Sequence, residues 1–282
     1  MNILFCIIFF FCCQPCNPLQ PEDQAILDRF FKYAEKNQLS HLSFQERIVK
    51  TGEFFLNTPY RGGTLEGNEK EQLVVNLRQL DCVTFVDNVM ALALLKRYDT
   101  EAYKEFLSNL QKIRYRNCKI SNYTSRLHYS TDWLYEMQRI GFVSDVTESS
   151  GGTPFPNKVG FISQNHRRYP ALVKDSTLIS EISRIERDIN ARNYFYIPKK
   201  KVNEKAGQVR NGDIILITTN RKGLDTSHVG IAIEKNGSIY LLHASLTAKK
   251  VIVSDVPLAT YLNQISSHTG IIIARPSDIN QN

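Results

Sequence analysis

Residues 80–95 read Leu80-Asp81-Cys82-Val83-Thr84-Phe85-Val86-Asp87-Asn88-Val89-Met90-Ala91-Leu92-Ala93-Leu94-Leu95, the most apolar helix candidate beyond the N-terminal leader of this 282-residue chain. Apolar residues lie nearly all round the helix, which predicts that it is buried. Asp81 can cap its N-terminus and would put Cys82 in the first turn. Unpaired backbone N–H groups and the helix dipole favour an anion there, so we expect the pKa of the Cys82 thiol to be lowered.

Helical patterns precede this segment. Apolar side chains from Pro21 to Asn37 share one helical face, and Ser43-Phe44-Gln45-Glu46 is a capping box that starts a helix ending near Phe55. Residues 100–200 carry mixed helical and irregular signals. We interpret them as an inserted, largely helical subdomain.

Strand patterns follow Gly207. They cover residues 213–219, 227–234, 238–245, 251–254 and 270–274. Lys235-Asn236-Gly237-Ser238 is a strong signal for a two-residue hairpin. Helices first and an antiparallel meander last predict an α+β protein, with residues 20–282 as a single domain.

Two histidines flank this hairpin. A turn at Asn236-Gly237 sets Gly230 opposite His243, so that His228 and His243 project from one side of the hairpin as diagonal neighbours. Their Cα or Cβ atoms should then lie roughly 5.5–8 Å apart. Solvated strand histidines are the alternative, but the flanking residues are apolar, which favours buried strands.

A lone cysteine at the start of an apolar helix is more often a small buried residue than a nucleophile. A thiol at a helix start, a histidine base on a sheet and a second polar residue to orient that base form the logic of a Cys-His-X triad. In this hypothesis Cys82 attacks a carbonyl, His228 takes its proton, and His243 fixes the tautomer of His228. Cys118 has no base nearby in sequence, and we interpret it as structural.

The same residues resemble a known superfamily, the NlpC/p60 papain-like cell-wall hydrolases. The motifs that carry the resemblance are Asp81-Cys82, Ser227-His228-Val229-Gly230-Ile231, Leu242-His243-Ala244-Ser245 and the loop Pro59-Tyr60-Arg61-Gly62-Gly63. The resemblance implies a papain-like core, with a nucleophile helix packed on an antiparallel sheet.

One subfamily is similar over most of the chain, from about Asn57 to Pro276. Its motifs here are Leu80-Asp81-Cys82-Val83-Thr84-Phe85-Val86, Arg126-Leu127-His128-Tyr129-Ser130-Thr131-Asp132-Trp133 and Gly223-Leu224-Asp225-Thr226-Ser227-His228. This subfamily was formerly a domain of unknown function and is now regarded as N-acetylmuramoyl-L-alanine amidases. Asp87 departs from it, since the family is expected to carry glutamate there.

The resemblance implies roles for individual residues. Cys82, His228 and His243 would be the triad, and Tyr60 would lie beside the nucleophile. Arg126, His128 and Tyr129 would line the substrate cleft, although His128 and Tyr129 could equally anchor the insertion. Arg78 could bind a substrate carboxylate or pair with Asp81.

Composition limits the other classes of function. The net charge is +7, but the basic residues are scattered and no zinc-finger or aromatic-basic pattern occurs, so we expect no nucleic-acid partner. No His-Glu-x-x-His motif or phosphate-binding glycine loop is present. We therefore expect neither a metal nor a cofactor.

The first residues, 1–16, resemble the apolar centre of a secretory signal peptide, although no lysine or arginine precedes it. No later apolar run is long enough for a transmembrane helix. Four of the six cysteines lie in or beside this leader and leave a lipidated cysteine open. We expect an exported protein, periplasmic or associated with the cell envelope.

Together these observations predict a cysteine-dependent N-acetylmuramoyl-L-alanine amidase that acts on peptidoglycan fragments. One alternative is an endopeptidase of the same fold that cuts within the stem peptide. Another, from a different class, is an inactive cell-wall-binding module. The filled triad positions argue against the binding module.

Overall fold

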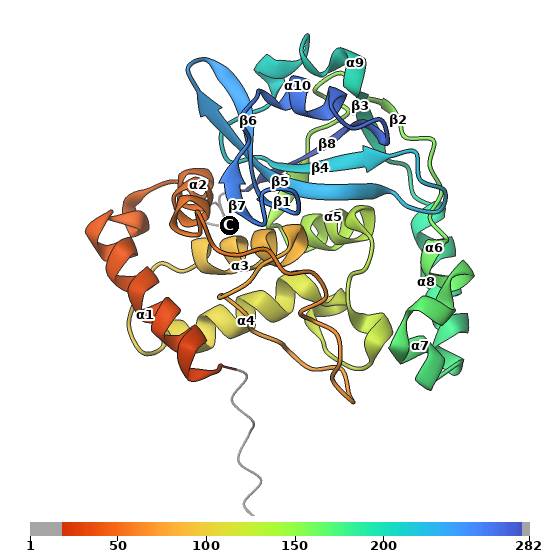
Figure 1. Cartoon of the computed structure of the whole chain (residues 1–282), viewed down its shortest axis with the longest axis horizontal. Coiled ribbons are helices and arrows are strands. Elements are labelled where there is room, and N and C mark those ends of the chain that lie inside the picture. Colours follow the sequence, from red (N-terminus) through yellow and green to blue (C-terminus); the bar gives the residue numbers. More distant parts are fainter. Residues whose placement is uncertain (1–18, 278–282) are drawn as a thin grey trace, which may run out of the picture.

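A computed structural model describes residues 19–277 of the chain. It is a mixed α/β structure in which helices pack on an antiparallel sheet (Figure 1). The helices are α1 (Pro21–Lys36), α2 (Phe44–Phe54), α3 (Cys82–Ala93), α4 (Ala102–Arg114), α5 (Ser130–Arg139), α6 (Phe161–Gln164), α7 (Pro170–Lys174), α8 (Thr177–Asn190), α9 (Lys199–Val202) and α10 (Leu258–Asn263). The strands are β1 (Val143–Asp145), β2 (Thr153–Pro154), β3 (Phe195–Pro198), β4 (Ile214–Thr219), β5 (Thr226–Lys235), β6 (Ser238–Ser245), β7 (Lys250–Val253) and β8 (His268–Pro276).

The strand order is β2-β3-β8-β4-β5-β6-β7, and β1 also pairs with β8. Strands β4 to β7 form the predicted meander, and β8 returns to pair with β4. The short strands β1, β2 and β3 come from the region interpreted as helical or irregular. Pro154 and Pro198 weakened the strand signal there, because proline cannot donate a ladder hydrogen bond.

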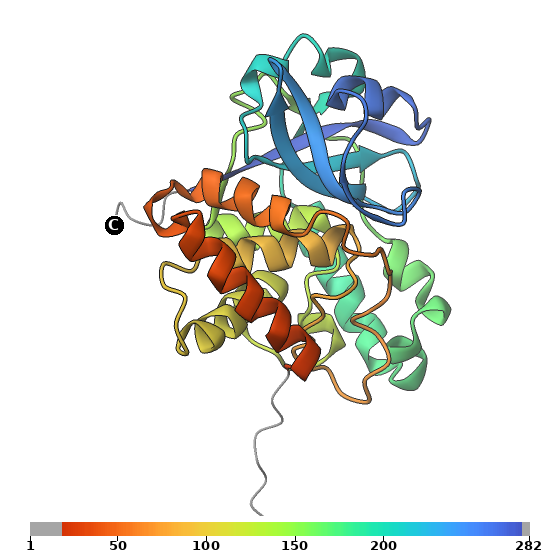
Figure 2. The same cartoon turned by 60° about the vertical axis from the view of Figure 1, so that its left-hand side comes forward.

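The two faces of the sheet are covered by different helices (Figures 1 and 2). Ile214 and Leu216 on β4 belong to the main core, together with residues of α1 to α5. Ile215 and Ile217 point to the other face and pack with residues of α9 and α10. Both faces are therefore apolar, as expected for a strand buried on both sides.

The predicted N-terminal helices are confirmed within one or two residues at each end. The capping box at α2 is present, since the Ser43 backbone N–H donates to Glu46 Oε2 at 2.9 Å and the Glu46 N–H donates to Ser43 Oγ. Helix α3 is buried along its length after the first turn and carries the main core with α4.

Residues 100–200 contribute to three apolar clusters, to the one on the α10 face of the sheet through Ile197 of β3. Helices α4 and α5 pack into the main core beside α3. The segment from α6 to α8 forms a cluster of its own with Tyr123 and Tyr129. The division into a core and an inserted subdomain stays a prediction. Among residues 19–277, no helix is long and apolar enough to cross a membrane.

Candidate active site

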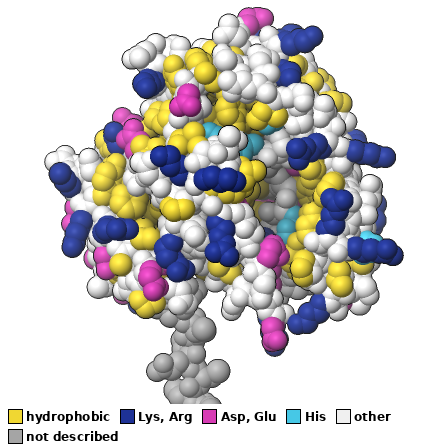
Figure 3. All heavy atoms as spheres, in the orientation of Figure 1, with side chains coloured by type: hydrophobic (Ala, Val, Ile, Leu, Met, Phe, Trp, Pro, Cys, Tyr) yellow, Lys and Arg dark blue, Asp and Glu magenta, His cyan; other side chains and the backbone are white. Residues whose placement is uncertain are grey.

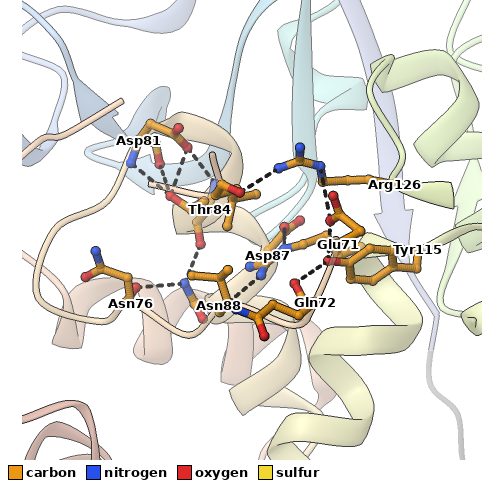
Figure 4. Close-up of polar contacts among 12 residues, drawn as sticks. Glu71, Gln72, Asn76, Asp81, Thr84, Asp87, Asn88, Tyr115 and Arg126 are labelled. Carbon is orange, nitrogen blue, oxygen red and sulfur yellow. Dashed lines mark hydrogen bonds and ion pairs between the residues drawn. The ribbon is translucent and has the colours of Figure 1, made fainter. Parts of the chain in front are cut away.

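Cys82 opens helix α3, and Asp81 is its N-cap, as predicted. The Asp81 Oδ1 atom accepts a hydrogen bond from the Thr84 backbone N–H at 2.8 Å, and Thr84 Oγ1 accepts one from the Asp81 N–H at 2.9 Å. Figure 4 shows these reciprocal contacts at the start of the helix. The cap fixes the first turn and so holds the half-buried Cys82 side chain in one place.

The expected lowering of the thiol pKa is wrong. Burial raises the pKa of Cys82 to about 12, and the neighbouring Asp81 carboxylate raises it further. The backbone N–H groups of Val229, Val83 and Cys82 itself lower the pKa, but their effect is weaker. Desolvation therefore exceeds the helix-start effect, and the resting thiol is protonated at neutral pH.

The hairpin that carries the two histidines has the predicted register. Ser238 faces Lys235, Leu242 faces Ile231, and both turn residues, Asn236 and Gly237, have positive φ. The ladder contacts end at Ile231↔Leu242. A Cβ on Gly230 would lie 3.0 Å from the Cβ of His243, so glycine is needed where that residue packs.

The two imidazole rings are in direct contact. His228 Nε2 and His243 Nδ1 lie 2.7 Å apart, and the ring planes are nearly perpendicular. The prediction that both histidines project from one side of the hairpin is confirmed. They point to the sheet face that α10 covers, with the same alternation as Ala232 and Leu241.

Burial also keeps this pair uncharged. It lowers the pKa of His228 to about 3 and that of the almost fully buried His243 to about 4. Both rings are therefore neutral at pH 7, and one proton lies in the hydrogen bond between them. A neutral imidazole can accept the proton that the Cys82 thiol holds.

Cys82 lies near β5 and near the residue that packs on this pair. The backbone N–H of Val229, the residue that follows His228, lowers the pKa of the Cys82 thiol. Cys82 in turn raises the pKa of Tyr261, whose ring packs on both histidines.

Two more aromatic residues lie around the pair, and no sequence motif predicted either of them. The Tyr261 ring of α10 lies 5.3 Å from the His243 ring, and the His268 ring of β8 lies 6.0 Å from that of Tyr261. We call His228, His243, Tyr261 and His268 the imidazole cluster. Its members come from three separate stretches of chain, and only the fold brings them together.

Tyr60 lies close to Cys82. Burial raises the pKa of its hydroxyl, and the nearby Cys82 adds to this. The Tyr60 N–H donates to Lys249 O, and Leu80 donates back to Pro59 O. These bonds fix the loop between β7 and the residue that precedes the Asp81 cap.

Arg126, His128 and Tyr129 line a cavity of about 90 Å³ together with Val83 and Val229, the neighbours of the nucleophile and of its candidate base. Figure 3 shows a hollow on this face, with hydrophobic side chains at its walls and histidine (cyan) on either side. The three residues are thus brought to one space beside Cys82. Val83 is 45% exposed there, although it belongs to α3, which is buried from Thr84 onwards.

The charge of Arg126 is already balanced. Its guanidinium lies 2.9 Å from Glu66 Oε1 and 3.6 Å from Glu71 Oε1, and it donates to the carbonyl of Leu65. Figure 4 shows Glu71 between Arg126 and Tyr115. Glu71 is buried, whereas the Glu66 side chain is 43% exposed, so only Glu66 is readily exchangeable.

His128 and Tyr129 make structural contacts as well. The Tyr129 hydroxyl donates to Glu186 Oε1 at 2.7 Å and accepts from the Ile162 N–H, which joins α5 to α6 and α8. His128 Nε2 lies 2.8 Å from the Tyr123 carbonyl, and its ring stacks on that tyrosine. Both residues therefore line the cavity and anchor the neighbouring segment.

Arg78 does not pair with Asp81. It bonds to the buried Asp23 of α1, at 3.2 Å from each carboxylate oxygen. The residue that the sequence placed a turn before the nucleophile helix thus ties that segment to the N-terminal helix. Cys118 and Cys82 are both free thiols. Among residues 19–277, no group of three or more histidine, cysteine or acidic side chains is arranged to hold a metal.

Comparison with known proteins identifies the family. Residues 50–271 match the model of the AmiA-like family, described as N-acetylmuramoyl-L-alanine amidase-like. An N-acetylmuramoyl-L-alanine amidase from Bacteroides uniformis is similar in structure, with a TM-score of 0.79 and 37% identity over 83% of this chain and 99% of that one.

Two other solved structures are similar. A Bacteroides fragilis protein, provisionally named a xylanase, has a TM-score of 0.76 and 37% identity over 80% of this chain and 99% of that one. A Legionella pneumophila protein has a TM-score of 0.68 and 23% identity over 91% of this chain and 95% of that one, which shows a shared fold. A search of curated proteins gave no match.

Proposed function

The chain belongs to the AmiA-like, N-acetylmuramoyl-L-alanine amidase-like family, and from this premise we propose that it is a cysteine-dependent N-acetylmuramoyl-L-alanine amidase acting on peptidoglycan fragments. The observation that supports the cysteine mechanism is the neutral, hydrogen-bonded pair of His228 and His243, packed against Tyr261, on which the protonated Cys82 thiol also acts. A family of cell-wall amidases also implies action outside the cytoplasm.

The reaction proceeds in two halves. Cys82 Sγ attacks the carbonyl carbon of the muramoyl lactyl group while His228 accepts the thiol proton. The amide C–N bond then breaks, His228 protonates the leaving amine of L-alanine, and a thioester remains. Water, deprotonated by His228, hydrolyses the thioester, which returns the proton to Cys82 and releases the lactyl carboxylate.

Because the pKa of the Cys82 thiol is high, His228 has to remove its proton during the attack. Thiolate is scarce at pH 7 when the pKa is near 12, so attack must be coupled to proton transfer to His228. His243 accepts the Nε2–H of His228, which leaves His228 Nδ1 free to act as the base. The backbone N–H of Cys82, at the helix start, is a donor for the developing oxyanion.

We assign the core to the papain-like NlpC/p60 class. A cysteine at a helix start, packed against an antiparallel sheet that carries the histidine, supports this assignment. Residues 1–16, the predicted signal peptide, lie outside the described residues. Their apolar composition supports export to the periplasm or envelope, and a lipidated cysteine is part of the same prediction.

Substrate recognition falls to the cavity and to the Tyr60 loop. Arg126, His128 and Tyr129 border the space into which one side of the substrate extends. A substrate carboxylate, such as that of D-glutamate, would reach Arg126 by replacing the half-exposed Glu66. Arg78 has its own partner in Asp23, which makes it the weaker candidate.

Product analysis of defined muropeptides tests the proposal. A muramoyl tripeptide should yield free N-acetylmuramic acid and intact peptide by mass spectrometry, and the sugar-free peptide should be a poor substrate. Cys82→Ala should abolish turnover with an unchanged thermal transition, and Cys118→Ser is the matched control that should retain activity. Xylan should release no sugar.

Other outcomes would identify the alternatives. Cleavage within the sugar-free stem peptide, lost in Cys82→Ala, would indicate an endopeptidase with the same nucleophile. Tight binding of muropeptides without turnover by the parent protein would indicate a binding module.

A further inference from the structure

Tyr261 occupies the centre of the imidazole cluster, and no role has been assigned to it. Its ring centroid lies 5.3 Å from that of His243, 6.0 Å from that of His268 and 6.4 Å from that of His228. The planes of Tyr261 and His243 meet at 71°, an edge-to-face arrangement. One side chain thus packs against both members of the pair.

The position of this ring is fixed by its helix. Leu258 and Leu262 of α10 are buried in the apolar cluster on this face of the sheet. The Tyr261 N–H donates to Pro257 O at 2.9 Å, which closes the first turn. The half-buried Tyr261 ring is therefore held over the histidines, because the helix that carries it is anchored by Leu258 and Leu262.

The ring of His243 has to be held in one orientation because this residue is an imidazole and not a carboxylate. A carboxylate in that place would only accept a hydrogen bond, whereas His243 Nδ1 can either accept or donate. If it donates, the proton of His228 moves to Nδ1 and the base is blocked. His243 Nε2, which must carry the other proton, is buried and forms no hydrogen bond within residues 19–277. Hydrogen bonds within the described residues therefore do not fix the ring orientation, and packing must.

We propose that Tyr261 is a positioning residue of the proposed amidase reaction, whose ring holds His243 against His228 and keeps water from His243. The inference rests on the proposed function of that pair. The Tyr261 ring packs edge-to-face on His243, which is 1% exposed, and so opposes rotation of that imidazole.

The titratable groups that act on the imidazole cluster come from two elements. They are His268 on β8, which acts on His228 and on which Lys199 and Arg221 act, and Cys82 on α3, which acts on Tyr261. Neither Lys199 nor Arg221 acts on His243, whose lowered pKa has burial as its cause. Removing the Tyr261 ring should therefore expose His243 to water and raise its pKa towards the usual histidine value.

The test compares variants that keep and remove the ring. Tyr261→Phe keeps it and should retain kcat within about 3-fold, whereas Tyr261→Leu should lower kcat by about 10–100-fold and change KM less than about 3-fold. In Tyr261→Leu the kcat/KM profile should gain an acid limb between about pH 5 and 7, near the usual histidine range. Asn263→Ala, on the exposed side of the same helix, is the control and should leave both unchanged.

Histidine NMR gives a readout that needs no substrate. The ring signals of His228 and His243, assigned with His→Gln variants, should not titrate above about pH 5 in the parent protein and in Tyr261→Phe, but should titrate near pH 6–6.5 in Tyr261→Leu. Unchanged titration and kcat in a folded Tyr261→Leu protein would overturn the inference. Altered titration in a protein that fails to cleave muropeptides would instead keep the inference and reject the proposed reaction.

Discussion

Two clusters of polar residues lie on either side of Cys82. Burial leaves the residues of one cluster uncharged, whereas those of the other keep their charges and form ion pairs. The imidazole cluster on the α10 side is uncharged, because burial lowers the pKa of each histidine. On the other side Arg126, Glu66, Glu71, Asp87 and Arg114 form an ionic cluster. Its best pair, Arg114 and Asp87, is 2.9 Å apart with both side chains 3% exposed.

The difference follows from the chemistry of the side chains. Histidine can lose its charge near neutral pH, so burial makes it neutral and ready to take up a proton. Arginine cannot, so each buried guanidinium needs a carboxylate within reach. The neutral side is thus suited to proton transfer, and the ionic side to holding its shape and accepting a carboxylate.

The largest effect should come from removing the base. His228→Ala should lower kcat/KM by about 10³-fold or more, because proton transfer from the thiol is lost, and His243→Ala by about 10–100-fold, because it only orients His228. The double variant should be no worse than His228→Ala. Steady-state kinetics on a muramoyl peptide would measure this, and a reversed order would exchange the two roles.

Next in size is the stability lost when the ionic cluster is broken. Arg114→Met should cost about 3–5 kcal/mol, since Asp87 is left buried without its partner. The double variant Arg114→Met with Asp87→Leu should recover much of that loss. Urea unfolding would report both, and a single variant that costs less than about 1 kcal/mol would mean that the pair is not desolvated.

Stability should also depend on pH through the imidazole cluster. Its histidines have lowered pKa values in the native state, so the unfolded chain binds more protons below about pH 6.5, and stability falls as the pH falls from 6.5 towards 4. His268→Gln should reduce this slope by up to about 1.4 kcal/mol per pH unit. His41→Gln, at an exposed residue, should leave the slope unchanged. An equal slope in His268→Gln would show that His268 is hydrated in solution.

The smallest effect is expected for Arg78, which pairs with Asp23 and not with a residue of the candidate site. Arg78→Gln should change kcat/KM less than about 2-fold and stability by about 1 kcal/mol or less, because its half-exposed side chain pairs only with Asp23. Arg126→Gln should lower both kcat/KM and stability more than Arg78→Gln does, since Glu71 would lose its cation. A tenfold rise in KM in Arg78→Gln alone would restore Arg78 as a substrate contact.

Local rules made the catalytic hairpin predictable. Two turn residues fix the register, the register fixes which side chains are neighbours, and His228 therefore meets His243 without any knowledge of the fold. The Asp81 cap follows from the helix pattern in the same way. Both are relations between residues close in sequence.

The other features of the candidate site depend on contacts between residues far apart in the sequence and on depth of burial, which no local pattern predicts. Tyr261 and His268 reach the histidines only because β8 returns beside β4, and α10 precedes that return. Arg78 finds Asp23, which is 55 residues earlier. The direction of the Cys82 pKa shift was wrong because it depends on the depth of burial, which a helix position does not reveal.

The Asp81 cap has a consequence for the chemical lifetime of the protein. Peroxides and disulfides react with thiolate much faster than with thiol. The carboxylate that stabilises the helix start also discourages ionisation of the neighbouring sulfur. A thiol with so high a pKa should thus resist oxidation, so the chemical lifetime of Cys82 and the start of its helix depend on the same side chain.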